Sequence, residues 1–206
     1  MAFWNLAESE PRRAHRFLLS IPALGTVLSP GLASTTSGTS TIGSSNTYHE
    51  YLCKTVTKPS YTISETEHKF LGNTYYYPGA VAWDAVSAQL VNSKTPDGNE
   101  LLYKALGASG WMNPDDQAAF FNTGPTAGTG AGPWTPNKKD ALAALGSVKI
   151  KELDGTGELI GTWELKNPFI TSVKFGDLDY SSEELLNIDI TFRYDFAIYG
   201  SGVVSS

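Results

Sequence analysis

Hydrophobic and polar residues alternate with a period of two near the end of the chain. The apolar positions are Ile188, Ile190, Phe192, Tyr194, Phe196 and Ile198. The polar positions between them are Asp189, Thr191, Arg193 and Asp195. Because successive side chains of a β-strand point to opposite faces of a sheet, this pattern predicts one strand with a buried face and a solvated face.

Aromatic residues within apolar strand patterns are the expected core of this fold. A large ring buried in a sheet contributes more apolar contact area than any aliphatic side chain. Phe192, Tyr194 and Phe196 belong to the apolar face of the last strand. Trp83 and Trp163 each lie beside other apolar residues in earlier strand-like segments, so we expect core positions for them as well.

Strand-like segments also occupy the first half of the chain. Each is rich in β-branched and aromatic residues and is bounded by proline or glycine, which interrupt a ladder of backbone hydrogen bonds. Pro78-Gly79 has the composition of a turn and is expected to separate two of these strands. The segments are 16–24, 52–57, 61–63, 70–77 and 80–91.

A β-hairpin is predicted between residues 147–153 and 158–166. The intervening Asp154-Gly155-Thr156-Gly157 is typical of a tight turn whose glycines adopt positive φ.

Helix signals replace strand signals between residues 97 and 146. Asp97 with Glu100 three residues later forms a capping pair, and Gly107 is the expected left-handed residue after the helix. A second helix is expected to begin at Asn113-Pro114, and a third to run from Thr135-Pro136 to Leu145, with Gly146 ending it. Residues 124–134 are rich in glycine and proline and are predicted to form a loop.

We expect residues 1–206 to form a single domain in which residues 97–146 are an insertion between strands. Residues 34–47 consist almost entirely of serine, threonine, glycine and asparagine. Such a segment buries too little apolar area to fix its own conformation. It is therefore either a mobile, solvated loop or an arm that becomes ordered on a neighbouring subunit.

Net charge and cysteine content exclude several classes of protein. The 206 residues carry a formal charge of −6, so binding of a phosphate backbone through lysine and arginine is not expected. The one cysteine, Cys53, permits neither an internal disulfide nor a cysteine-based zinc site. A secretory leader and a membrane span are also not expected, and we predict synthesis and assembly inside a cell.

Residues that could perform chemistry are sparse. His15, His49 and His68 do not cluster with one another or with the cysteine. The series Asp177, Asp179, Ser181 and Glu183 has the oxygen spacing at the start of a calcium loop. It lacks that loop's glycine and its final glutamate, because Ser182 and Ile188 occupy those positions. We therefore expect no catalytic, cofactor-binding or metal site, and no enzymatic activity.

Three segments in this order resemble the tail tube proteins of contractile-tailed bacteriophages. They are LCKTVTKPSYTI, YYYPGAVAWDAVSAQLV and GTWELKNPFITSVKFGDLDYSSEELLNIDITFRYDFAIY. The landmarks are Tyr77-Pro78-Gly79 leading to Trp83, and a W-x-L-x-N-x-F segment beginning at Trp163, followed by an L-D-Y turn. Together with RFLLSIPAL near the start, they cover roughly half of the chain. Residues 34–47 and 107–137 do not align with the family.

The resemblance implies a mainly β, sandwich- or barrel-like fold with short flanking helices. It also implies rings of six copies whose strands join one inner β-barrel, and rings that stack into a tube. The implied partners are further copies of the chain, a tail sheath protein, baseplate and tail terminator proteins, and double-stranded DNA that passes through the lumen without specific binding. The implied location is the virion, after assembly in the host cytoplasm.

Several alternatives remain at this stage. The polar face with Asp189, Thr191, Arg193 and Asp195 either lines the lumen or points outward to solvent or sheath. The chain could instead form the inner tube of a related injection system that carries protein. A carbohydrate-binding β-sandwich would use exposed tyrosine and tryptophan, and a hydrolase would require the acidic residues Asp177 and Asp179.

Overall fold

The computed structural model describes residues 12–22, 24, 50–94, 97–111, 135–181 and 183–201. The expectations for the segment 34–47, for a helix at Asn113-Pro114 and for the loop 124–134 fall outside these residues. The described part is mainly β, as predicted, and all of its strand pairs are antiparallel.

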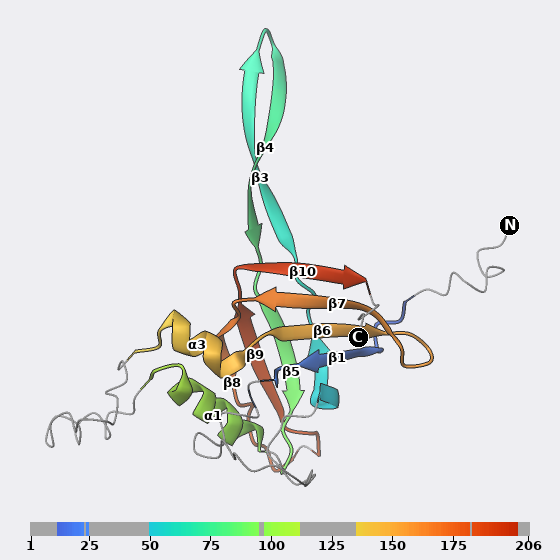
Figure 1. Ribbon diagram of the computed structural model, residues 1–206, viewed down its shortest axis with the longest axis vertical. Coiled ribbons are helices and arrows are strands. Elements are labelled where there is room, and N and C mark those ends of the chain that lie inside the picture. Colours follow the sequence, from blue (N-terminus) through green and yellow to red (C-terminus); the bar gives the residue numbers. More distant parts are fainter. Residues whose placement is uncertain are drawn as a thin grey trace, which may run out of the picture.

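Two four-stranded sheets and one long hairpin make up the β-structure (Figure 1). Sheet A has the order β1 (Phe17–Ser20), β6 (Val148–Leu153), β7 (Leu159–Lys166) and β10 (Phe196–Ser201). Sheet B has the order β2 (Cys53–Val56), β5 (Val86–Val91), β9 (Asn187–Arg193) and β8 (Phe169–Lys174). The hairpin consists of β3 (Tyr61–Phe70) and β4 (Asn73–Trp83). A 3-10 turn, η3 (Glu50–Leu52), precedes β2.

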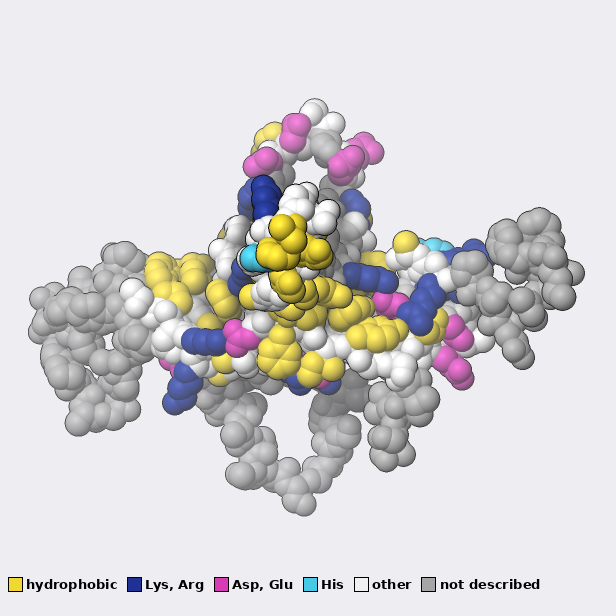
Figure 2. Space-filling view, turned by 90° about the horizontal axis from the view of Figure 1, so that it is seen from above, with side chains coloured by type: hydrophobic (Ala, Val, Ile, Leu, Met, Phe, Trp, Pro, Cys, Tyr) yellow, Lys and Arg dark blue, Asp and Glu magenta, His cyan; other side chains and the backbone are white. Residues whose placement is uncertain are grey.

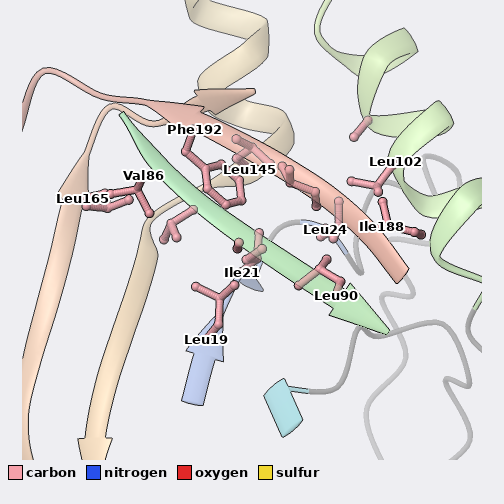
Figure 3. Close-up of a cluster of buried hydrophobic side chains, with 14 of the residues drawn as sticks. Leu19, Ile21, Leu24, Val86, Leu90, Leu102, Leu145, Leu165, Ile188 and Phe192 are labelled. Carbon is pink, nitrogen blue, oxygen red and sulfur yellow. The ribbon is translucent and has the colours of Figure 1, made fainter. Parts of the chain in front are cut away.

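The strands of sheet A run across those of sheet B (Figure 1). The apolar faces of the two sheets contribute to one buried cluster. Leu19 and Leu165 of sheet A meet Val86 and Phe192 of sheet B in this cluster (Figure 3). Ile150 and Ile190 belong to the same cluster. The helices α1 (Gly98–Ala108) and α3 (Lys138–Leu145) add leucines to the same cluster. This arrangement confirms the sandwich-like prediction, and the described residues of one chain form no closed barrel.

Helix α1 begins where the capping pair predicts and extends further than expected. The Asp97 carboxylate accepts a hydrogen bond from the backbone N–H of Asn99 at 3.0 Å. Glu100 bonds Lys104 rather than the cap. Gly107 lies inside the helix, and the left-handed residue is Gly110, with φ of 104°.

Helix α3 begins later than predicted. Its N-cap is Asn137, whose side-chain oxygen accepts from the backbone N–H of Asp140 at 2.9 Å. Gly146 ends the helix at φ of 67°, as expected.

The turn predicted at residues 154–157 is present, but only one of its two glycines adopts positive φ. The Asp154 carboxylate accepts hydrogen bonds from the backbone N–H groups of Thr156 and Glu158, and Gly157 adopts φ of 88°. This local network closes the hairpin of β6 and β7.

The expected turn at Pro78-Gly79 is wrong, because both residues lie inside β4. The reversal is at Leu71-Gly72, where both residues have positive φ. Pro78 and Gly79 mark an irregularity in the ladder, since Ile63 pairs with Val81 while Glu65 pairs with Pro78. A β-carbon at Gly79 would collide with Oγ of Ser64 and lie 3.0 Å from its carbonyl oxygen, so the close approach of the two strands favours glycine.

The predicted single last strand is also wrong. The chain leaves sheet B after β9 and enters sheet A as β10, and the backbone N–H of Asp195 bonds the carbonyl of Lys166 at 3.0 Å. The crossing changes which side chains face the core. Tyr194 is buried, whereas Phe196 is 45% exposed and Ala197 packs inward in its place.

Candidate assembly surfaces

The β3–β4 hairpin projects from the body (Figure 1). It carries exposed apolar side chains along its length. A ten-residue strand spans about 33 Å. Seen along the hairpin, hydrophobic side chains gather at the centre of the surface (Figure 2). The exposed set is Tyr61, Ile63, Phe70, Leu71, Tyr75, Tyr76, Tyr77 and Val81.

The strand register gives the hairpin two different faces. Residues directly opposite each other in an antiparallel ladder share a face. His68 pairs with Tyr75 and Thr66 with Tyr77, which makes one outer face aromatic. Glu67 pairs with Tyr76 on the other face, where it also bonds Lys69 at 3.0 Å.

Trp83 joins the hairpin to the body. Its ring centroid lies 5.3 Å from that of Tyr61 and 6.0 Å from that of Tyr194. Trp83 is half-buried and packs against the core, as does Trp163, whose ring lies 4.9 Å from that of Tyr199. Together with the buried Phe192 and Tyr194, the two tryptophans lie at or beside the core, and Phe196 does not.

The polar face of sheet B holds three of the four residues suggested for a lumen. Asp189, Thr191 and Arg193 alternate with buried residues along β9, on the side away from the core. The Gln89 amide donates to Asp189 at 3.0 Å, and Lys174 pairs opposite Asp189. This face therefore carries both charge signs instead of a continuous row of carboxylates.

Asp195 does not belong to that face. Its carboxylate accepts hydrogen bonds from Lys138 of α3 and from the Asn167 side chain, which holds the pKa of Asp195 below its usual range. Asp195 thus ties the crossing between the sheets to helix α3.

A buried carboxylate lies at the end of the sandwich near β1. Glu152 is 7% exposed, and its two oxygens lie 2.9 Å from Nη1 of Arg12 and 2.7 Å from Nζ of Lys58. Arg12 also donates to the hydroxyl of Tyr199 at 2.9 Å. Burial raises the pKa of Glu152, but the hydrogen bonds from Lys58 and Arg12 outweigh it, so the net pKa is lowered.

We expect Glu152→Gln to lower the free energy of unfolding at neutral pH by roughly 1.5–3 kcal/mol, since hydrogen bonds to a charged group are lost. A lowered folded-state pKa stabilises the protein above the ordinary glutamate pKa, and this stabilisation is lost as the pH falls through the folded-state pKa. The difference between wild type and variant should therefore shrink below about pH 4. Urea unfolding at several pH values measures it, and a constant difference would contradict the assignment.

The acidic series after β8 forms a turn in which the Asp179 carboxylate is hydrogen-bonded within the turn. The Asp179 carboxylate accepts from the backbone N–H of Ser181 at 2.9 Å and from its hydroxyl at 2.8 Å. Leu178 and Tyr180 are 88% and 112% exposed. Among the residues that the structure describes, no group of three or more metal-ligating side chains comes together.

The other candidates for chemistry were the cysteine and the three histidines. Burial raises the pKa of the Cys53 thiol to about 12, so it stays protonated at neutral pH. His68 lies on the exposed hairpin and His15 lies just before β1, while His49 is outside the described residues. No helix in the described part of the chain is long and apolar enough to span a membrane.

No protein-family model and no curated protein matches the chain. Solved structures do match over nearly its full length. A chain of the sheath/tube terminator of the extracellular contractile injection system PVC, in the extended state, is 17% identical with a TM-score of 0.54, covering 95% of this chain and 100% of that one. The chain therefore shares its fold with a component of a contractile injection system.

Two further solved structures share this fold. A chain of the PVC sheath-tube complex is 16% identical with a TM-score of 0.51, covering 98% of this chain and 99% of the other. A chain of the sixfold-symmetrised baseplate of the anti-feeding prophage is 15% identical with a TM-score of 0.53, covering 94% and 97%. The resemblance to the tail tube family is therefore confirmed at the level of the fold.

Proposed function

We propose that this chain is a structural subunit that assembles with further copies of itself into rings and a tube within a contractile particle. The hairpin carries this proposal. Its tyrosines are roughly half exposed or more, and a two-stranded hairpin on its own is marginally stable in water. A surface of this kind is stabilised when it is covered by another subunit.

Free sheet edges support the same proposal. Among the described residues, β10 pairs only with β7, and its Phe196, Ile198 and Tyr199 are at least 40% exposed. An exposed, apolar edge strand is a template for pairing with another chain. Contacts between unlike surface patches close into rings or continue as filaments, which is the geometry that a tube needs.

A passive conduit is the specific role that we propose. We infer that Asp189, Thr191 and Arg193 face the lumen and that six copies close the ring. Their mixed charges would neither hold nor strongly repel a passing cargo, which suits double-stranded DNA in a phage tail. Sheath, baseplate and terminator proteins are the proposed partners, the virion is the proposed location, and no catalysis is required.

Electron microscopy of the purified wild-type protein tests this function. We expect rings, stacked rings or tubes across a range of protein and salt concentrations. Exclusively monomeric protein under all of these conditions would contradict the proposal. The diameter and the rotational averages of the rings would also measure the number of subunits.

A further inference from the structure

A cavity of about 330 Å³, here called the helix cavity, lies between α1, α3 and β8. None of the described residues that line it is charged. Tyr103, Leu106 and Phe175 line it although each is at least 41% exposed. An exposed apolar hollow of this kind marks a surface that another molecule covers. Its other apolar lining residues include Leu102, Ala141, Leu145, Phe169 and Val173.

The helix cavity runs along the edge of sheet B. Five consecutive residues of β8, from Phe169 to Val173, line it. Among the described strands, β8 pairs only with β9, so no described strand lies along its other edge. A strand edge beside pockets for side chains is the arrangement that binds an added β-strand. The occupant that fits is therefore an extended segment with apolar side chains.

The β3–β4 hairpin supplies such a segment in every copy. At its tip, Phe70 is 57% exposed and Leu71 is 85% exposed. The aromatic face next to the tip contains no carboxylate, lysine or arginine, because Glu65, Glu67 and Lys69 alternate to the opposite face. That aromatic face consists of the facing pairs Thr66 and Tyr77, His68 and Tyr75, and Phe70 and Asn73.

The tip of the hairpin and the helix cavity lie at opposite ends of the molecule. The hairpin projects from one side of the body, whereas α1 and α3 lie on the other side (Figure 1). A tip therefore does not reach the cavity of its own chain. A second copy displaced along the long axis presents its tip to that cavity, and the contact can be repeated head-to-tail from copy to copy.

Charge and size favour the helix cavity over the exposed apolar residues of β10. Phe196 and Ile198 pair opposite Lys166 and Glu164, which bond each other at 2.7 Å, so covering them would also remove an ion pair from water. The described lining of the helix cavity imposes no such cost. A protein cavity of about 150 Å³ holds a benzene molecule, so the helix cavity has room for an aromatic ring and a leucine side chain.

We propose that the hairpin tip of one copy inserts Phe70 and Leu71 into the helix cavity of the next copy along the tube. The half-exposed rings of Phe70, Tyr75 and Tyr77, together with Leu71, offer roughly 400 Å² of surface, about half of what each partner contributes to a stable interface. One such contact is weak, and it becomes sufficient when the subunits of a ring form it together. This inference rests on the proposed self-assembly and names the surface that receives the hairpin.

Site-specific crosslinking tests the contact. Asn73→Cys protein, which keeps Phe70 and Leu71, is mixed with Ser172→Cys protein under conditions in which the wild type assembles. Both positions are exposed, so folding should be unaffected. After oxidation, we expect a disulfide-linked dimer from the mixture on a non-reducing gel. Wild-type protein treated in the same way checks that Cys53, whose burial raises the thiol pKa to about 12, does not react.

Two further samples show which surface receives the tip. Ile198→Cys places a thiol on β10, and its crosslinking to Asn73→Cys in place of Ser172→Cys would overturn the proposal. Asn73→Cys alone should give at most traces of dimer, and a strong dimer would show that tips meet each other instead. If wild-type tubes form and the Ser172→Cys mixture gives no crosslink, the docking contact is wrong although the proposed function stands.

Leu71→Asn gives an independent readout, because it separates folding from assembly. Asparagine adopts the left-handed conformation of this turn more readily than leucine, so the melting temperature of the unassembled subunit should not fall. The protein concentration needed for assembly should rise by about tenfold, because an apolar side chain no longer enters the cavity. Glu67→Gln, on the opposite face of the hairpin, should leave it unchanged. Assembly of Leu71→Asn at the wild-type concentration would contradict the proposal.

Discussion

Replacing residues 62–82 with Asn-Gly is expected to abolish ring and tube formation and to leave the body of the subunit folded. Tyr61 and Trp83 pair directly opposite each other, so a two-residue turn can join them. The removed residues are exposed throughout β3 and β4 and add nothing to the buried cluster. The loss is therefore confined to contacts between subunits.

Electron microscopy and thermal unfolding together measure this result. We expect no assemblies and a melting temperature within about 4 °C of that of the unassembled wild type. Glu67→Ala is a matched control, since it removes one exposed ion pair of the hairpin and leaves the aromatic face intact. Tubes formed by the shortened protein would show that the hairpin is not the assembly surface.

Phe192→Ala is expected to lower the free energy of unfolding by about 3–5 kcal/mol. Phe192 is fully buried in β9, between its ladder partners Val86 on β5 and Ile170 on β8. Its removal opens a cavity where the two sheets and the helices meet. Since a domain is typically stabilised by only about 5–15 kcal/mol, much of the native population should be lost on mild heating.

Urea unfolding of the unassembled protein, followed by tryptophan fluorescence, measures this effect. The neighbouring Arg193→Ala is the control, because Arg193 is exposed on the opposite face of the same strand. We expect a change of less than about 0.5 kcal/mol for it. Similar losses in the two variants would mean that the faces of β9 are assigned the wrong way round.

The burial of β9 could be predicted from sequence, because alternation with a period of two reports directly which residues share a face. Phe196 continues this alternation along the sequence, but its side chain is exposed instead of buried. The crossing at Asp195 depends on Lys138 and Asn167, which lie 57 and 28 residues away. A local pattern contains no information about partners at such distances.

The sequence predicts only part of the β3–β4 hairpin. The polar residues Ser64 to Lys69 resemble a loop, although they continue β3, because neither face of the hairpin is buried and no alternation is required. The composition of Pro78-Gly79 is typical of a turn, which is why the turn was predicted at the wrong position. The true turn, Leu71-Gly72, has a leucine where asparagine or aspartate is usual.

Leu71, at the tip of the hairpin, makes the free subunit less stable in two ways. Its φ of 48° is the left-handed conformation, which costs a residue other than glycine about 1–2 kcal/mol. Leu71 is also 85% exposed, so the hydration of its apolar side chain adds to the backbone cost. Burial of this leucine by another subunit removes the hydration cost while the turn keeps its conformation, which gives the subunit a thermodynamic bias away from the solitary state.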